Sequence, residues 1–78
     1  MKLILVEWVD SAFAQGWMAR DSVKAHRLWD CVSAGILVSE TKDRITIMQS
    51  ASVDKDQYGD GITIPKACIK KIWKLGVK

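Results

Sequence analysis

The chain has 78 residues, two cysteines, one histidine and a formal net charge of +3, and this length allows a single domain. A domain this small has a thin hydrophobic core and often gains stability from disulfides, metals or association between chains. With only Cys31, Cys68 and His26 as candidate ligands and no Cys-x-x-Cys pair, the composition argues against a disulfide framework and a four-ligand zinc site. We therefore expect association into a homo-oligomer.

The basic residues are concentrated at the C-terminal end. Residues 1–61 carry seven Lys or Arg and nine Asp or Glu, whereas residues 62–78 carry five lysines and no acidic residue. A basic stretch of this kind attracts phosphate groups. The alternative interpretation is that these lysines lie on an edge strand, where lysine discourages strands of different molecules from pairing.

The N-terminal residues do not resemble a targeting segment. The apolar run within residues 2–9 contains Glu7, is followed by Asp10 and lacks a small-residue cleavage site. It is also much shorter than the ~20 residues that span a bilayer. We therefore expect a cytoplasmic protein without membrane association, with reduced and buried thiols at Cys31 and Cys68.

The first half of the chain predicts a strand, a loop and a short helix. Residues 2–9 are rich in branched and large side chains on both faces, so a helix or a neighbouring subunit should cover the second face. Residues 10–20 form a loop with Gly16 as its flexible point. Asp21 is the expected N-cap of a helix over Ser22–Trp29, which is too short to be stable unless it packs on another element.

Residues 30–50 predict an antiparallel hairpin. The alternation in residues 30–39 places Val32, Ala34, Ile36 and Val38 on one face of the first strand. Gly35 within this strand indicates a bend or a close backbone approach. Residues 40–43 form a polar turn, and residues 44–50 return with Ile45 and Ile47 facing inward.

The remaining residues predict a mostly β fold. Residues 51–60 read as a polar connection, and residues 61–65 as a short strand that Pro65 ends. Residues 66–68 fit one 3₁₀ turn, and residues 69–75 form either a strand or a short helix. This order predicts an α+β fold, a small SH3-like or Sm-like barrel of about five antiparallel strands with one short helix inserted after strand 1. An α+β roll is the alternative.

Four short motifs follow one another along the chain: Trp-x-Asp-Ser, Gly-Trp, Ser-x-Gly-x-Leu and Ile-Pro-x-x-x-Ile. In this combination the chain resembles small uncharacterised proteins encoded by bacteriophages and prophages, and the resemblance extends from Val6 to Ile72. It implies a phage origin and the host-cell cytosol as the location. It supplies no catalytic residues.

No residue pattern points to an enzyme. Ser11 follows Asp10, but no spacing places His26 beside it as a base, and a Gly-x-Ser-x-Gly elbow is missing. The stretch DKDQYGDG begins like an EF-hand loop but has Pro65 where a bidentate Glu is required. The sequence therefore predicts a non-enzymatic protein without catalytic residues, a metal site or a cofactor.

The loop after the first strand gathers the candidate ligand-binding residues, which are Trp8, Asp10, Ser11, Phe13 and Trp17. Aromatic rings offer flat faces to a nucleobase, and Asp or Ser can form hydrogen bonds with a ribose or a base edge. The alternative is that the two tryptophans fill the end of the barrel while Asp10 and Ser11 cap the loop backbone.

These patterns lead to two hypotheses of function. In the first, the protein is an oligomer that sequesters a small nucleotide-type ligand, and the phage resemblance implies antagonism of host defence signalling. In the second, it is an Sm-like or SH3-like nucleic-acid-binding or protein-adaptor module. Single strands are held by positive grooves and stacking aromatics. The residues for that role would be Lys66, Lys70, Lys71, Lys74 and Tyr58, with Trp73 as a second aromatic residue.

Overall fold

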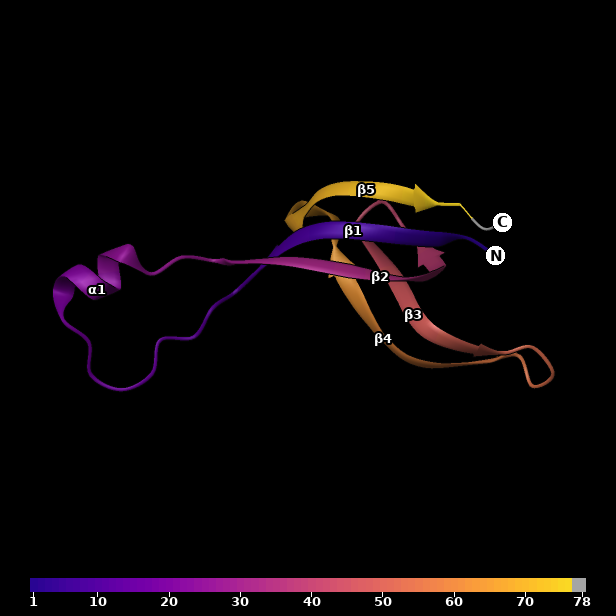
Figure 1. Cartoon of the computed structure of the whole chain (residues 1–78), viewed down its shortest axis with the longest axis horizontal. Helices are drawn as coiled ribbons and strands as arrows, with labels where there is room; N and C mark the ends of the chain where they lie inside the picture. Colours follow the sequence, from indigo (N-terminus) through magenta and orange to yellow (C-terminus); the bar gives the residue numbers. More distant parts are fainter. Residues whose placement is uncertain (77–78) are drawn as a thin grey trace.

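A computed structural model describes residues 1–76, so the part of the basic stretch at Lys78 lies outside the described residues. Five strands, one short helix and one 3₁₀ turn follow one another along the chain (Figure 1). Their bounds are β1 Leu3–Asp10, α1 Arg20–Ala25, β2 Trp29–Glu40, β3 Arg44–Ser52, β4 Gln57–Pro65, η1 Lys66–Cys68 and β5 Ile69–Leu75.

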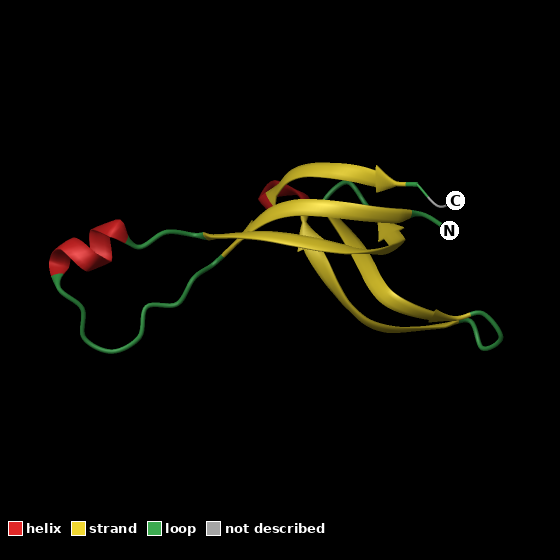
Figure 2. Ribbon diagram, viewed as in Figure 1, coloured by secondary structure: helices red, strands yellow, loops and turns green. Residues whose placement is uncertain are grey.

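The five strands form one antiparallel sheet in the order β4-β3-β2-β1-β5. The sheet curls, and β3 and β4 run at a steep angle to β1 and β5 (Figure 2). Within residues 1–76 no ladder joins the edge strands β4 and β5, so the sheet is open. The mostly β fold, its five antiparallel strands and the helix after the first strand are confirmed.

The core lies on the inner side of the curled sheet and consists of five aliphatic residues, Ile4, Val6, Ile45, Ile47 and Ile64. They alternate in pairs along β1 and β3, as the two-residue period of a strand requires, and β4 contributes Ile64. The inward orientation predicted for Ile45 and Ile47 is confirmed, and both are almost fully buried. Five buried side chains make a thin core for a chain of this length.

Two glycines allow strands to approach closely where the sheet bends. A Cβ added at Gly35 would lie 2.8 Å from the backbone oxygen of Met48. A Cβ added at Gly61 would overlap the Met48 side chain and the backbone oxygen of Ile47. The close backbone approach predicted at Gly35 is therefore confirmed, and a second one occurs at Gly61.

The expectation of a polar connection over residues 51–60 is wrong. β3 continues to Ser52 and β4 already begins at Gln57, so the turn spans only residues 53–56. Asp56 adopts a positive φ of 52°, which aspartate tolerates better than most side chains. Polar residues fit these strands because this end of the hairpin is largely exposed to solvent.

The predicted helix over Ser22–Trp29 is displaced. α1 spans Arg20–Ala25, its N-cap is Ala19 rather than Asp21, and none of its residues is buried. Trp29 instead pairs with Asp10 at the end of the β1–β2 ladder, so sheet pairing overrides the helical pattern there. α1 lies away from the sheet and cannot cover the second face of β1 (Figure 1). No helix in residues 1–76 has the length and apolar character to cross a membrane.

Strand pairing determines the state of the last element. Residues 69–75, which the pattern left open, form strand β5, and pairing with β1 selects this state. The 3₁₀ turn over residues 66–68 is confirmed. Cys31 and Cys68 are free and half-buried, so the expectation of buried thiols is met only in part.

The close approach at Gly35 leads to a first prediction. We expect Gly35→Ala to lower the free energy of unfolding by about 1–3 kcal/mol, because the new methyl group meets backbone that cannot rotate away. Urea unfolding followed by circular dichroism measures this change. Gly59→Ala is the matched control, since its Cβ would meet only Ser50, at 3.9 Å. Equal stability of the two variants would contradict the packing at Gly35.

An ion pair ties η1 to the end of β2 and leads to a second prediction. Lys66 Nζ lies 2.8 Å from Glu40 Oε2, and the hydrogen bond and charge of Lys66 lower the pKa of Glu40 below its ordinary value of 4.5. A carboxylate with a lowered pKa stabilises the fold above its unfolded pKa, and this contribution disappears as the pH falls through its folded pKa.

We therefore expect Glu40→Gln to lower the urea midpoint slightly at neutral pH, with the difference from wild type vanishing in acid. The effect is small because both side chains are well exposed. The control is Asp43→Asn, which removes the same charge from the neighbouring turn and leaves the Lys66 pair intact. A difference between the variant and wild type that is the same at all pH values would show that Lys66 does not stabilise the Glu40 carboxylate in the fold.

Candidate functional site

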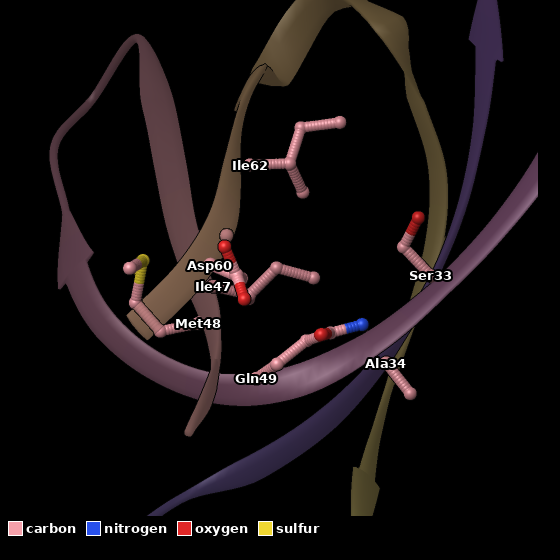
Figure 3. A pocket seen from close by; sticks show the side chains of 8 residues that line it. Ser33, Ala34, Ile47, Met48, Gln49, Asp60 and Ile62 are labelled. Carbon is pink, nitrogen blue, oxygen red and sulfur yellow. The ribbon is translucent and has the colours of Figure 1, made fainter. Parts of the chain in front are cut away.

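A pocket of about 350 Å³ lies where the sheet bends between β2, β3 and β4. It is lined by Ser33, Ala34, Ile47, Met48, Gln49, Asp60, Gly61 and Ile62. Gln49 and Ile62 point toward the side where Ser33 lies, whereas Ala34 and Met48 point away (Figure 3). The volume lies in the range of small-molecule sites, which extends from about 300 to 1,000 Å³.

Backbone geometry places the polar groups of this pocket. Gln49 and Asp60 lie opposite each other between the paired positions Met48–Gly61 and Ser50–Gly59. Asp60 adopts a positive φ of 47°. Side chains alternate along a strand, so Gln49 shares the face of Ile47. The Gln49 carboxamide and the Asp60 carboxylate therefore lie beside the apolar side chain of Ile47.

Ser33 is held in place by Trp8. The Trp8 indole Nε1 donates a hydrogen bond of 3.0 Å to Ser33 Oγ, and both residues lie on the inner face of the β1–β2 pair. Because the indole is the donor, the hydroxyl proton of Ser33 remains able to donate to another group. The pocket can therefore offer one donor from Ser33, acceptors from Asp60, and both kinds of group from Gln49.

The chemistry of this lining favours one part of a nucleotide over another. No Lys, Arg or His is among the lining residues, and the Asp60 carboxylate would repel a phosphate. Base edges and ribose hydroxyls, by contrast, donate hydrogen bonds to carboxylates and amides. The apolar side chains of Ile47 and Ile62 can contact the flat face of a base.

The five ligand-binding residues predicted from the sequence are spread over a long distance. Trp8 lies in the sheet behind Ser33. Asp10 ends β1, and its Oδ1 accepts the backbone N–H of Ser11 at 2.8 Å, which is a loop-capping contact. Phe13 and Trp17 lie on the exposed connection to β2, with 84% and 104% of their surface accessible. Neither of them lines the pocket between β2, β3 and β4.

The lysines predicted for nucleic-acid binding are separated from Tyr58 but lie near Trp73. Tyr58 belongs to β4, at the opposite edge of the sheet from β5. Lys66 pairs with Glu40, Lys70 lies 3.4 Å from an Asp30 oxygen, and Lys71 stands over the Trp73 ring at 4.6 Å. Lys74 is exposed on β5, the edge position that the alternative interpretation of these lysines requires.

Groups that could carry other chemistry are dispersed. His26 Nε2 lies 2.9 Å from the backbone oxygen of Phe13, a contact that closes the loop between β1 and β2. In the described residues no three His, Cys, Asp or Glu side chains come together as metal ligands.

The pocket residues Ser33, Gln49, Asp60 and Ile62 are absent from the sequence-based candidates. Asp60 lies between two glycines, which sequence reasoning assigns to a turn. The available signal in the sequence was the pair of glycines at positions 35 and 61, since glycines inside strands often mark sites where a ligand or backbone comes near.

Comparisons of the chain with protein-family models, with curated proteins and with solved structures find no match.

The contact between Trp8 and Ser33 leads to a third prediction. We expect Ser33→Ala to lower the free energy of unfolding by about 1 kcal/mol, because a partly buried indole N–H loses its acceptor. One indole resonance in the ¹H–¹⁵N NMR spectrum should also shift strongly. Ser39→Ala, on the exposed end of the same strand, is the control. An unmoved indole resonance in the Ser33 variant would contradict the hydrogen bond.

Proposed function

We propose that the protein is a non-enzymatic binding protein that sequesters a small nucleotide-type ligand, with the base and ribose in the pocket between β2, β3 and β4. The observation that carries this proposal is a pocket of about 350 Å³ in which Ser33, Gln49 and Asp60 adjoin Ile47 and Ile62. Hydrogen-bonding groups beside an apolar wall suit a flat, polar ring. The phosphates would remain outside, away from the carboxylate.

The wider setting is part of the same proposal. The resemblance to phage-encoded proteins favours a location in the host cytosol and antagonism of host defence signalling by capture of a nucleotide signal. We also propose that the fold is an SH3-like or Sm-like barrel. Support comes from β5 lying beside β1 and from the 3₁₀ turn that joins β4 to β5.

The nucleic-acid-binding or protein-adaptor alternative has weaker support. Its lysines lie on and beside β5, and two of them already contact carboxylates. Tyr58 lies at the other edge of the sheet. A nucleic-acid strand on this surface would therefore meet the lysines together with Trp73, which lies beside Lys71 on β5, but not with Tyr58.

A thermal-shift screen tests the proposed function and gives a fourth prediction. We expect cyclic dinucleotides, ADP-ribose or mononucleotides to raise the Tm, and inorganic phosphate to leave it unchanged. At a ligand concentration about 100-fold above Kd, the stabilisation is about 2.7 kcal/mol, which corresponds to a rise in Tm of about 10 °C or more in a domain of this size.

Matched variants connect any such shift with the pocket. Gln49→Ala and Asp60→Asn should each reduce the shift by removing hydrogen-bonding groups that face the ligand. Gln57→Ala in the same hairpin and Asp43→Asn in the turn between β2 and β3 remove the same side-chain types outside the pocket and should keep the full shift. The proposal fails if no nucleotide raises the Tm, or if the pocket variants respond like their controls.

A further inference from the structure

The connection between β1 and β2 exposes apolar residues that nothing within residues 1–76 covers. We call residues 11–28, which include α1, the arm. Its exposed large apolar side chains are Phe13, Trp17, Met18, Val23 and Leu28. α1 has only six residues, none of them buried, and such a short helix is not stable in water without packing. The arm therefore has the properties of a surface that is covered in the functional state.

The exposed area of the whole chain leads to the same conclusion. Its accessible surface is 6512 Å², whereas a compact protein of this mass exposes about 4,800 Å². The radius of gyration is 16.3 Å, against about 11.5 Å for a compact domain of this length. The excess of about 1,700 Å² is twice the ~800 Å² that each partner buries in a standard protein–protein interface.

The arm and the β3–β4 hairpin carry opposite charges. The arm has three basic residues, Arg20, Lys24 and Arg27, and one acidic residue, Asp21, which gives a net charge of +2. We call residues 49–61 the acidic hairpin. It has three acidic residues, Asp54, Asp56 and Asp60, and one basic residue, Lys55, which gives a net charge of −2. It also exposes Val53 and Tyr58, so both surfaces combine charge with apolar area.

The arm and the acidic hairpin cannot meet within one chain. They extend from opposite ends of a molecule that is 54 Å long, 26 Å wide and 23 Å deep (Figure 1). If two copies lie side by side with their long axes antiparallel, the arm of each lies beside the hairpin of the other. A twofold axis then relates two identical contacts and closes the assembly at two chains.

We propose that the arm docks on the acidic hairpin of a second copy and that the protein is a twofold dimer held by two such contacts. The arm supplies basic and aromatic side chains, and the hairpin supplies carboxylates and exposed apolar side chains. In this dimer the exposed arm of each chain is covered by the acidic hairpin of the other chain.

This arrangement also brings an aromatic residue to the pocket, a step that rests on the proposed function. Gln49, Asp60 and Gly61 of the pocket belong to the acidic hairpin, and no aromatic residue lines the pocket. An arm docked on that hairpin brings Phe13 and Trp17 of the second copy toward its opening. An aromatic ring there can stack on a base whose edge is bound by Gln49 and Asp60.

Charge reversal on the full-length chain tests the dimer without any ligand. The arm variant is Arg20→Glu with Lys24→Glu, and the hairpin variant is Asp54→Lys with Asp56→Asn, which keeps a residue type that tolerates positive φ. All four positions are exposed, so circular dichroism should show unchanged folds. Light scattering after size exclusion then gives the mass of each protein and of their equimolar mixture.

We expect the wild type to have twice the chain mass of 8.8 kDa. Each variant alone should raise the dimer dissociation constant at least about tenfold, because like charges then face each other in both contacts. The mixture should recover the dimer, since each reversed surface meets its opposite. A monomeric wild type, variants that dimerise normally, a mixture that stays monomeric or an assembly larger than two chains would each overturn the proposal.

Nucleotide binding by the same proteins separates the two proposals. Where the dimer forms as described and no nucleotide raises the Tm, the dimer stands and the proposed function fails. If the pocket binds nucleotides in the monomeric variants as well as in the wild-type dimer, the Tm shift should still be larger for the dimer. Trp17→Ala should remove this gain, whereas Trp29→Ala, which lies outside the arm at the start of β2, should retain it.

Discussion

The structure depends on the position of β1 between β2 and the edge strand β5. β1 pairs with β2 along one side and with β5 along the other, and it contributes Ile4 and Val6 to the buried core. Because its inner face is fixed by these two side chains, Trp8 is fixed on the same face and reaches Ser33. The first strand of the chain thus organises the core, the second edge of the sheet and one wall of the pocket.

Alternation along β3 identified Ile45 and Ile47 as inward-facing, because burial on one face of a sheet imposes a period of two residues. In β2 the more apolar face, with Val32 and Val38, is instead exposed. The close approach at Gly35 was predicted from a glycine inside a strand. Alternation could not identify residues 69–75 as a strand, since that choice depends on pairing with β1, more than 60 residues away in sequence. It also missed the strand pairing around Ser52 and Gln57, where exposed strands need no apolar pattern.

The candidate site was harder to predict because its residues are close in space and distant in sequence. Ser33 and Asp60 come from different strands, and only the bend at Gly35 and the tight passage at Gly61 place them around one space. The aromatic cluster around Trp17 is prominent in the sequence for the opposite reason. Its members are neighbours along the chain, but the extended arm carries Trp17 away from Trp8.

Core size connects the arm, the pocket and stability. With only five buried aliphatic side chains, the sheet has little burial to offset the entropy of ordering its chain, and the acidic hairpin contributes none of those five residues. A partner that covers this hairpin stabilises the strands that carry Gln49 and Asp60. Any ligand that prefers the covered hairpin must then strengthen the association of the two chains by the same factor, because coupling between two binding equilibria is reciprocal. In the proposed dimer, the surface that covers the hairpin and the proposed ligand pocket therefore act through the same pair of strands, β3 and β4.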